Sequence, residues 1–235
     1  MAIEDLRRRD WILLPGTLCT YDVFSGFLDA LDVPTGRRRP VALCHATIEA
    51  YEDVLTSRAK DAVICGFSLG AIVAAHHVHR LPAHRIILFG LNPFPDDPAR
   101  AADRHDLACD VVAKGGAAAL MSRLPALLGP EPDQARAAIL AMADAAAKDI
   151  DVQTNLALSR PGAVAALSAA RSPVVVLTGS EDGMAPVTYG QAAAAAAPGG
   201  RFCLLPRIGH YALIEDPVAC AEAVISTRTP LDGIP

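Results

Sequence analysis

The stretch Asp61-Ala62-Val63-Ile64-Cys65-Gly66-Phe67-Ser68-Leu69-Gly70 passes from a short apolar run into a Gly-x-Ser-x-Gly turn. Residues 62–65 are apolar and partly β-branched, which predicts a strand buried on both faces. From residue 69 to residue 80 the apolar residues recur at helical spacing, which predicts a helix. Ser68 therefore lies on a sharp turn between strand and helix, where its neighbours must be small, and Gly66 and Gly70 meet that need.

This turn presents the Ser68 hydroxyl at the carboxyl end of the predicted strand. The following helix begins there, so its N-terminus and the Leu69 amide point at any anion that forms beside the hydroxyl. Such an arrangement suits acyl chemistry. The alternative is that Ser68 is an ordinary helix N-cap, for which serine is also a favoured residue.

Strand and helix alternate on both sides of this turn. The expected strands are residues 11–14, 41–43, 62–65, 85–89, 174–177 and 202–205, and the expected helices are residues 21–31, 48–58, 69–80, 186–197 and 214–226. Parallel neighbours need long crossover connections, so the alternation predicts an α/β fold with a mostly parallel sheet of about six core strands flanked by helices. Ligands are expected at the carboxyl ends of the strands.

The alternation stops between residues 95 and 167, where no strand signal occurs and Ala, Leu, Asp and Arg recur at helical spacing. We therefore expect an inserted helical segment at 95–167 and a core domain made of residues 1–94 and 168–235. The insertion either covers the functional site or forms a helical subdomain that never contacts substrate.

Composition narrows the possible classes of function. The chain has 235 residues, which suits one sizeable domain, and a net charge of −5 without a Lys/Arg-rich face argues against a nucleic-acid partner. The apolar run 11–14 is stopped by Pro15-Gly16, so we expect neither a signal peptide nor a membrane span. Six cysteines without a Cys-x-x-Cys pair predict buried, reduced thiols and a cytoplasmic protein.

A serine hydroxyl needs a base to become a nucleophile, and the base needs a partner that orients it. Asp182 is the candidate partner, because it lies on the turn that follows the strand at 174–177, although Glu181 beside it is a rival. His210 is the candidate base, because it lies on the loop after the strand at 202–205. Either residue could instead have only a structural role.

The chain order Ser68, Asp182, His210, with each residue after its own strand, resembles that of the α/β-hydrolase family, serine esterase type. The run Gly-x-x-Asp-x-x-x-Pro at 179–186 and the Gly-His pair at 209–210 are similar to the acid and base loops of that family. The size of the helical segment and the Ser-Arg-Pro-Gly run at 159–162 look most like small bacterial esterases of the pimeloyl-carrier-protein methyl esterase type.

The resemblance implies a Ser68-His210-Asp182 triad and a helical cap over the active site. It also implies an oxyanion hole made by the amides of Leu69 and Thr17, with Leu18 as the alternative to Thr17. The chain departs from the usual family pattern at Pro15, where many members have histidine.

The resemblance further implies hydrolysis of a carboxylic ester through an acyl-enzyme, without metal or cofactor. The expected partner is a small-molecule ester or thioester, with an apolar acyl or alcohol group suggested by Ala, Leu and Met in the cap. A thioesterase, acyltransferase or carbon–carbon bond hydrolase would use the same three residues. A non-catalytic member of the fold that binds a small molecule is the alternative from another class, and the oligomeric state is left open.

The other histidines give weaker signals. His76, His77 and His79 share one predicted helix, but their spacing is not that of a zinc site, so we expect them to be packed or solvated. His45 follows a predicted strand and could line the pocket, although a structural role is the simpler interpretation.

Overall fold

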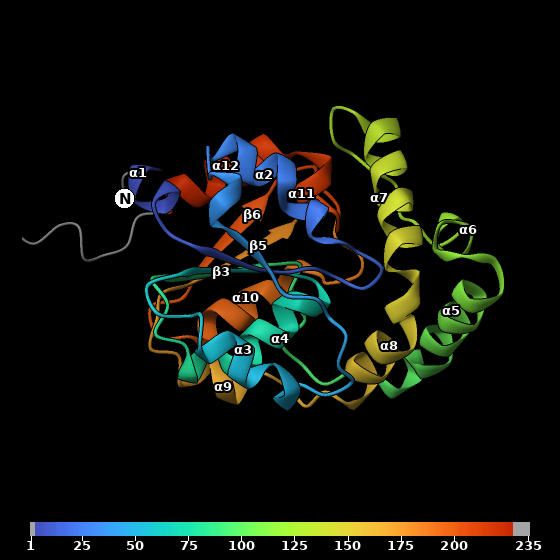
Figure 1. The fold of residues 1–235 in the computed structure, drawn as a ribbon, viewed down its shortest axis with the longest axis horizontal. Coiled ribbons are helices and arrows are strands. Elements are labelled where there is room, and N and C mark those ends of the chain that lie inside the picture. Colours follow the sequence, from blue (N-terminus) through green and yellow to red (C-terminus); the bar gives the residue numbers. More distant parts are fainter. Residues whose placement is uncertain (1–2, 228–235) are drawn as a thin grey trace, which may run out of the picture.

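Six parallel strands form a single sheet in the computed structural model, which describes residues 3–227 (Figure 1). The order of the strands across the sheet is β2-β1-β3-β4-β5-β6. The strands are β1 (Trp11–Leu14), β2 (Arg38–Pro40), β3 (Val63–Phe67), β4 (Arg85–Phe89), β5 (Val174–Gly179) and β6 (Arg201–Leu205). The predicted α/β class and the parallel sheet of six strands are confirmed.

Helices connect the strands and cover the sheet. The α-helices are α1 (Ile3–Arg7), α2 (Ser25–Ala30), α3 (Glu52–Thr56), α4 (Leu69–His77), α5 (Ala101–Lys114), α6 (Gly116–Met121), α7 (Pro132–Ala146), α8 (Ile150–Ser159), α9 (Val164–Ser168), α10 (Val187–Ala196), α11 (Ala212–Glu215) and α12 (Pro217–Ser226). Short 3₁₀ helices are Tyr21–Phe24, Thr35–Arg37, Glu49–Tyr51, Val78–Arg80, Pro98–Arg100 and Ala147–Asp149.

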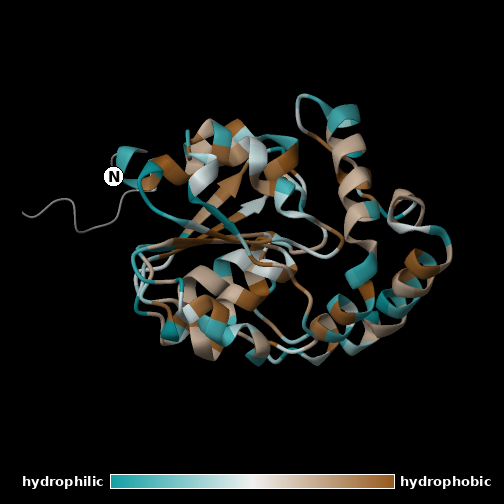
Figure 2. Cartoon of the chain, in the orientation of Figure 1, coloured by the Kyte–Doolittle hydropathy of each residue, from teal (hydrophilic) through white to brown (hydrophobic). Residues whose placement is uncertain are grey.

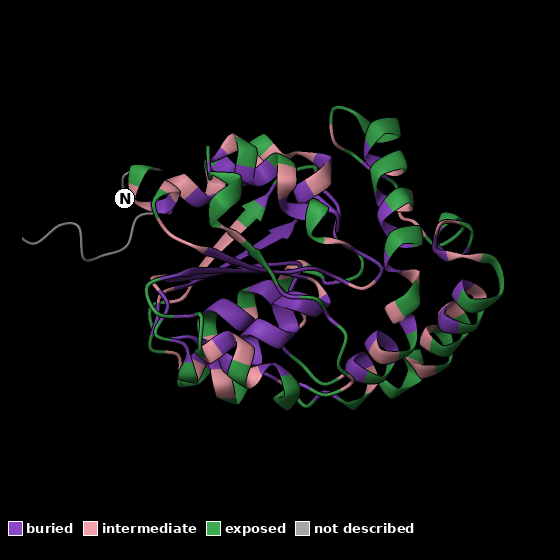
Figure 3. Ribbon diagram, in the orientation of Figure 1, coloured by how far each residue is buried: buried purple, intermediate pink, exposed green. Residues whose placement is uncertain are grey.

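The four inner strands, β1, β3, β4 and β5, are buried along their whole length, whereas the edge strands β2 and β6 are largely exposed or half-buried (Figure 3). Trp11 and Leu13 belong to the core on the side of α2 and α12, whereas Ile12 and Leu14 belong to the core on the side of α4, α9 and α10. Figure 2 shows these strands as the most continuously hydrophobic part of the chain. Two-sided burial explains why the strands appear in the sequence as unbroken apolar runs rather than alternating ones.

Helix α4 lies close to the middle of the sheet, and all nine of its residues are buried. A Cβ atom at Gly70 would lie only 2.0 Å from the Leu14 carbonyl oxygen. Glycine is therefore required sterically at this position, and the contact brings the start of α4 against the loop that leaves β1. Ser68 and Thr17 consequently line the same cavity.

Two predicted elements were wrong in their boundaries. The second strand is Arg38–Pro40 rather than residues 41–43, because Trp11–Leu13 pair with Arg38–Pro40. Val41 and Leu43 are buried in the core just beyond the strand, so their apolarity signals burial and not pairing. The closing helix at 214–226 is divided into α11 and α12, because the Asp216 side chain caps a new helix at the Ala219 amide and Pro217 occupies its first turn.

Helices α5 to α8 lie beyond the carboxyl ends of the central strands, on the right in Figure 1. Helix α7 contacts α11, which anchors this group to the core. Helix α9 packs against α4 and α10, beside the sheet. The division into a cap at 95–167 and a core made of the remaining residues stays a prediction.

The structure also bears on the expectations about a membrane span and about the cysteines. None of the described helices is long and apolar enough to cross a membrane. The cysteines are free thiols, but the expectation that they are buried holds only for Cys19, Cys65 and Cys220, since Cys44 and Cys109 are exposed and Cys203 is half-buried.

Candidate active site

Ser68 occupies a strained turn between β3 and α4. Its backbone has φ 50° and ψ −114°, a conformation that costs free energy for a residue with a side chain. The Ser68 amide donates a hydrogen bond to the Phe89 carbonyl at 2.9 Å, which ties the turn to β4. At Gly66 a Cβ atom would lie 2.6 Å from the Ala71 Cα, so the turn needs the small residue that the sequence has there.

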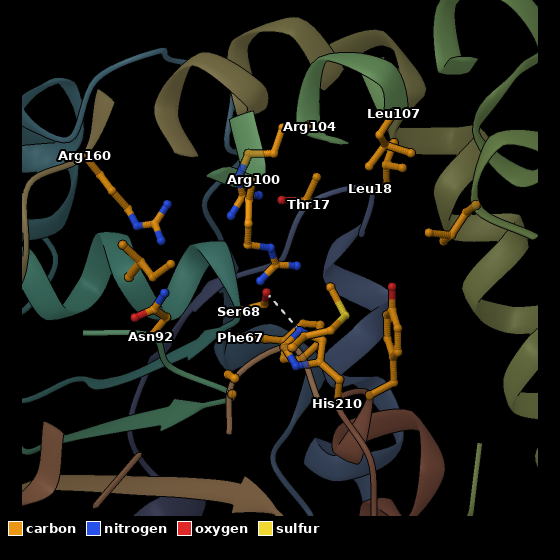
Figure 4. Close-up of a pocket in the computed structure, with 16 residues that line it drawn as sticks. Thr17, Leu18, Phe67, Ser68, Asn92, Arg100, Arg104, Leu107, Arg160 and His210 are labelled. Atoms are coloured by element: carbon orange, nitrogen blue, oxygen red, sulfur yellow. Dashed lines mark hydrogen bonds between the residues drawn. The ribbon is translucent and has the colours of Figure 1, made fainter. Parts of the chain in front are cut away.

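The structure brings His210 and Asp182 to Ser68, as the order of strands predicts. The His210 Nε2 lies 3.1 Å from the Ser68 Oγ (Figure 4). On the other side of the ring, the His210 Nδ1 lies 2.8 Å from the Asp182 Oδ2. Both Asp182 and His210 are 5% exposed. The three side chains therefore form one chain of hydrogen bonds that is largely shielded from solvent.

Asp182, and not Glu181, contacts the imidazole. The second carboxylate oxygen of Asp182 accepts hydrogen bonds from the amides of Met184 at 2.9 Å and Ala185 at 2.8 Å. These bonds orient the other carboxylate oxygen of Asp182, Oδ2, toward His210. Glu181 is exposed and accepts a hydrogen bond from the Ser180 hydroxyl instead.

Glu215, which is 2% exposed, stabilises the loop that carries His210. Its Oε2 accepts hydrogen bonds from the Gly209 amide at 3.0 Å and from the Leu128 amide at 2.9 Å. Opposite the imidazole lies Gly90, where φ is +57° and a Cβ atom would come within 3.0 Å of the His210 Cε1. Glu215 thus fixes the backbone of the loop, and the close approach of Gly90 limits the space around the ring.

The loop after β1 distinguishes between the two candidates for the second oxyanion amide. The Leu18 amide donates a hydrogen bond to the Gln153 Oε1 at 3.0 Å, and Gln153, on α8, is 2% exposed. The Thr17 amide donates no hydrogen bond to any described residue. Thr17 also lines the cavity in front of Ser68, so the geometry favours Thr17 over Leu18 as the donor that is free for substrate.

A cavity of about 120 Å³ opens in front of Ser68 and His210. Its other lining residues are Thr17, Leu18, Phe67, Ile72, Gly90, Asn92, Arg100, Arg104, Leu107, Leu120, Arg160, Met184, Ala185 and Tyr211. The apolar members agree with the expected apolar substrate group. The three arginines and Asn92 were missed by the sequence analysis, although the four-residue spacing of Arg100 and Arg104 places them on one face of a helical turn.

A sequence profile of the alpha/beta hydrolase family matches residues 9–223, which is nearly the whole chain. The chain belongs to the alpha/beta hydrolase family. This alpha/beta hydrolase is 28% identical over 256 residues to the pimeloyl-[acyl-carrier protein] methyl ester esterase of Aromatoleum aromaticum, covering 93% of this chain and 98% of the relative.

Solved structures share the fold of this alpha/beta hydrolase. An esterase from Thermogutta terrifontis superposes with a TM-score of 0.75 at 22% identity, covering 92% of this chain and 88% of that chain. The enol-lactonase from Burkholderia xenovorans LB400 superposes with a TM-score of 0.75 at 20% identity, covering 93% and 90%. The homologues and neighbours support a hydrolase enzyme with esterase-like relatives.

The remaining histidines of the alpha/beta hydrolase lie outside the cavity in front of Ser68. His45 is exposed, packs edge-to-face against Tyr51, and does not line the cavity, so its possible place in the pocket was wrong. His76 and His77 are buried in α4, and the His77 Nε2 contacts the Ile48 carbonyl at 2.9 Å. Among the described residues no group of three or more His, Cys, Asp or Glu side chains could hold a metal ion.

Gln153 offers a test of the loop that follows β1, because its side chain accepts the hydrogen bond of the Leu18 amide. Gln153→Met keeps the length of the side chain but leaves the Leu18 amide buried without an acceptor, a loss that costs about 1–3 kcal/mol. We expect the loop to shift and the kcat for a short-chain ester to fall about 10-fold, with little change in KM. Steady-state kinetics would measure this, with Asp151→Asn, an exposed change on the same helix, as the control. A higher kcat in Gln153→Met would instead identify the freed Leu18 amide as the oxyanion donor.

His76 predicts how the stability of the hydrolase depends on pH. Burial lowers the pKa of His76 to about 4, with the positive charges of His77 and Arg160 acting in the same direction. In the unfolded chain its pKa returns to about 6.5, so the unfolded state binds more protons between pH 6.5 and pH 4. The free energy of unfolding should therefore fall as the pH falls from 6.5 to 4. Above pH 6.5, His76 should make no contribution to the pH dependence of stability.

Urea unfolding at pH 7.5 and pH 5 would measure this effect. We expect His76→Gln to lose less stability on acidification than the wild type, because Gln does not titrate. His105→Gln, an exposed change on α5, is the matched control and should keep the wild-type pH dependence. An unchanged pH dependence in His76→Gln would contradict the prediction.

Proposed function

We propose that this protein hydrolyses a carboxylic ester through an acyl-enzyme on Ser68. The observation that carries the proposal is the imidazole of His210, which bridges the Ser68 Oγ at 3.1 Å and the Asp182 Oδ2 at 2.8 Å. A histidine placed between a hydroxyl and a buried carboxylate can remove the hydroxyl proton and share the resulting positive charge.

In the first half of the reaction, Ser68 attacks the ester carbonyl while the His210 Nε2 accepts the hydroxyl proton. This role requires the His210 Nδ1 to carry a proton and to donate a hydrogen bond to the Asp182 Oδ2, which stays ionised. The two amide donors to the Asp182 Oδ1 keep that carboxylate oriented while the imidazolium forms. His210 then donates the proton to the departing alcohol, which leaves the acyl group on Ser68.

The negative charge that develops on the carbonyl oxygen needs donors that are in place before the reaction. In this proposal the Leu69 amide at the start of α4 and the Thr17 amide supply them. A water molecule, activated by the same imidazole, then attacks the acyl-enzyme and releases the acid. Every step uses groups of the chain and water.

The choice of ester is guided by the relatives. The homologue that is 28% identical is named for the hydrolysis of a methyl ester, so methyl esters are the first substrates to test. The apolar residues Leu107, Leu120 and Met184 are among those that line the cavity, and they suit a methylene chain.

Labelling with a small fluorophosphonate tests the proposal without knowledge of the natural substrate. We expect the intact mass to increase by one phosphonyl group, and peptide mapping to place the group on Ser68. Ser68→Ala protein should remain unlabelled under the same conditions. Native protein that stays unlabelled, and that also leaves short-chain methyl esters intact, would support the non-catalytic binding alternative instead.

A further inference from the structure

The cavity in front of Ser68 and His210 is lined by three arginines, Arg100, Arg104 and Arg160, but by no acidic side chain of the described residues. In Figure 4 these arginines extend from the insertion toward the cavity on the side of Ser68 opposite His210. An ester is neutral and does not need such charge near its carbonyl. The arginines therefore call for an explanation beyond the chemistry of the ester group itself.

Two of the arginines share a single carboxylate. The Arg104 Nε and Nη2 contact the Asp96 carboxylate oxygens at 2.5 and 2.6 Å, and the Arg160 Nη2 contacts the Asp96 Oδ1 at 3.0 Å. Burial opposes the charge of Asp96, yet the hydrogen bonds and charges of the two arginines hold its pKa below the usual value. Asp96 therefore carries one negative charge against two positive charges.

Arg160 is 3% exposed, and its Nε is buried without a hydrogen-bond partner among the described residues. Burial lowers its pKa, and the charges of Arg104 and Arg100 act in the same direction against the attraction of Asp96. Buried cations are stable only when they are paired, so this site has an unmet demand for negative charge.

The Arg100 amide donates a hydrogen bond to the Asp97 carbonyl at 2.9 Å, but the Arg100 guanidinium makes no hydrogen bond and no ion pair with any residue in the range 3–227. It ends the 3₁₀ helix Pro98–Arg100, just before α5, and in Figure 4 its guanidinium lies in the direction of Ser68. Asp103 and Asp106 line a neighbouring cavity together with Arg100, but not the cavity that contains Ser68. On the side of Ser68, the guanidinium of Arg100 is thus available to a ligand.

We infer that the substrate carries a free carboxylate in addition to the ester that is cleaved, and that Arg100 binds this carboxylate beside the Asp96-Arg104-Arg160 cluster. The inference rests on the proposed ester hydrolysis and names its substrate class: a monoester of a dicarboxylic acid. A guanidinium matches a carboxylate through two parallel hydrogen bonds, which gives both affinity and orientation. The apolar residues of the cavity, Leu107, Leu120 and Met184, then contact the methylenes between the two ends.

Matched pairs of methyl esters test this substrate class. Monomethyl esters of the linear dicarboxylic acids from succinate to suberate are compared with the methyl esters of the monocarboxylic acids of the same carbon number. We expect at least one charged ester to be hydrolysed with a kcat/KM about 10- to 100-fold higher than that of its neutral counterpart, mainly through a lower KM. Equal or lower kcat/KM values for all the charged esters would overturn the inference.

The Arg100→Gln variant tests whether Arg100 is the residue that causes the preference for charged esters. This change should lower kcat/KM for the preferred charged ester about 10- to 100-fold and leave that of the neutral ester within about 3-fold. Arg100→Lys should recover part of the loss, because it restores the charge but not the two-pronged geometry. Arg171→Gln removes the same charge from an exposed position outside the cavity and is the matched control. A loss shared equally by charged and neutral esters would also overturn the inference.

A binding measurement separates this inference from the proposed chemistry. Ser68→Ala protein is titrated by calorimetry with monomethyl adipate and with methyl hexanoate. Tighter binding of monomethyl adipate that is lost in the Ser68→Ala, Arg100→Gln double variant supports the carboxylate site even if no ester is turned over. Equal binding of the two esters contradicts it. Inorganic phosphate should compete more weakly than adipate at equal concentration, and stronger competition by phosphate would contradict the assignment to a carboxylate.

Discussion

Ser68→Ala is expected to lower the kcat for a short-chain methyl ester by about 10⁴-fold or more. The variant removes the oxygen that would attack the carbonyl and form the acyl-enzyme. It leaves the cavity, the amides of Leu69 and Thr17, and the His210-Asp182 pair in place. The remaining activity would come from water activated by His210, which lacks the position that the turn gives to the Ser68 hydroxyl. Steady-state hydrolysis with purified protein at matched concentration measures the effect.

The substitution should not unfold the protein, so the loss can be assigned to chemistry. The turn at residue 68 already accommodates a side chain at φ 50°, and alanine has the same Cβ atom as serine. The one side-chain hydrogen bond lost is the bond to His210. Ser57→Ala, an exposed change at the end of α3, is a matched control and should keep wild-type kcat. A kcat for Ser68→Ala within about 10-fold of the wild type, at equal Tm, would remove Ser68 from the mechanism.

Much of the candidate site could be predicted because it depends on local signals. The glycines at 66 and 70 mark the strained turn, and parallel strands bring their carboxyl ends to one edge of the sheet. Ser68, Asp182 and His210 each follow their own strand, so the topology alone brings them close together. The sequence already favoured Asp182 over its neighbour Glu181, and in the structure Asp182 is the one that contacts His210, because adjacent residues on a tight turn point in different directions.

The features that the sequence did not reveal depend on contacts between distant segments. Gln153 and the Leu18 amide are 135 positions apart, and nothing in the spacing of an Ala-rich helical segment marks the residue that will reach the loop after β1. The same holds for Arg160 and Asp96, which meet only when α8 folds back beside the start of α5. The second strand was misplaced because apolar residues just beyond the strand are as deeply buried as residues within one.

Asp182→Asn is expected to lower kcat by about 10³- to 10⁴-fold, although it changes the size of the side chain very little. The amides of Met184 and Ala185 donate to the Asp182 Oδ1, so an asparagine would keep its oxygen at that position. Its NH₂ group would then face the His210 Nδ1. Because an NH₂ group can only donate, the imidazole would have to carry its proton on Nε2, the atom that must accept the proton of Ser68.

The neighbouring carboxylate provides the control for this prediction. Glu181→Gln removes the same negative charge one residue earlier, at an exposed side chain that contacts Ser180 and not His210. Its kcat should stay within about 3-fold of the wild type, whereas a general effect of charge on the loop would slow both variants alike. If Glu181→Gln were the slower variant, the orienting carboxylate would be Glu181, and the loop would have to rearrange before the reaction. If only Asp182→Asn is slow, and its KM and Tm are unchanged, the loss of kcat comes from the position of the proton on His210. The hydrogen bonds from Asp182 through His210 to Ser68 would then control the transfer of the Ser68 proton.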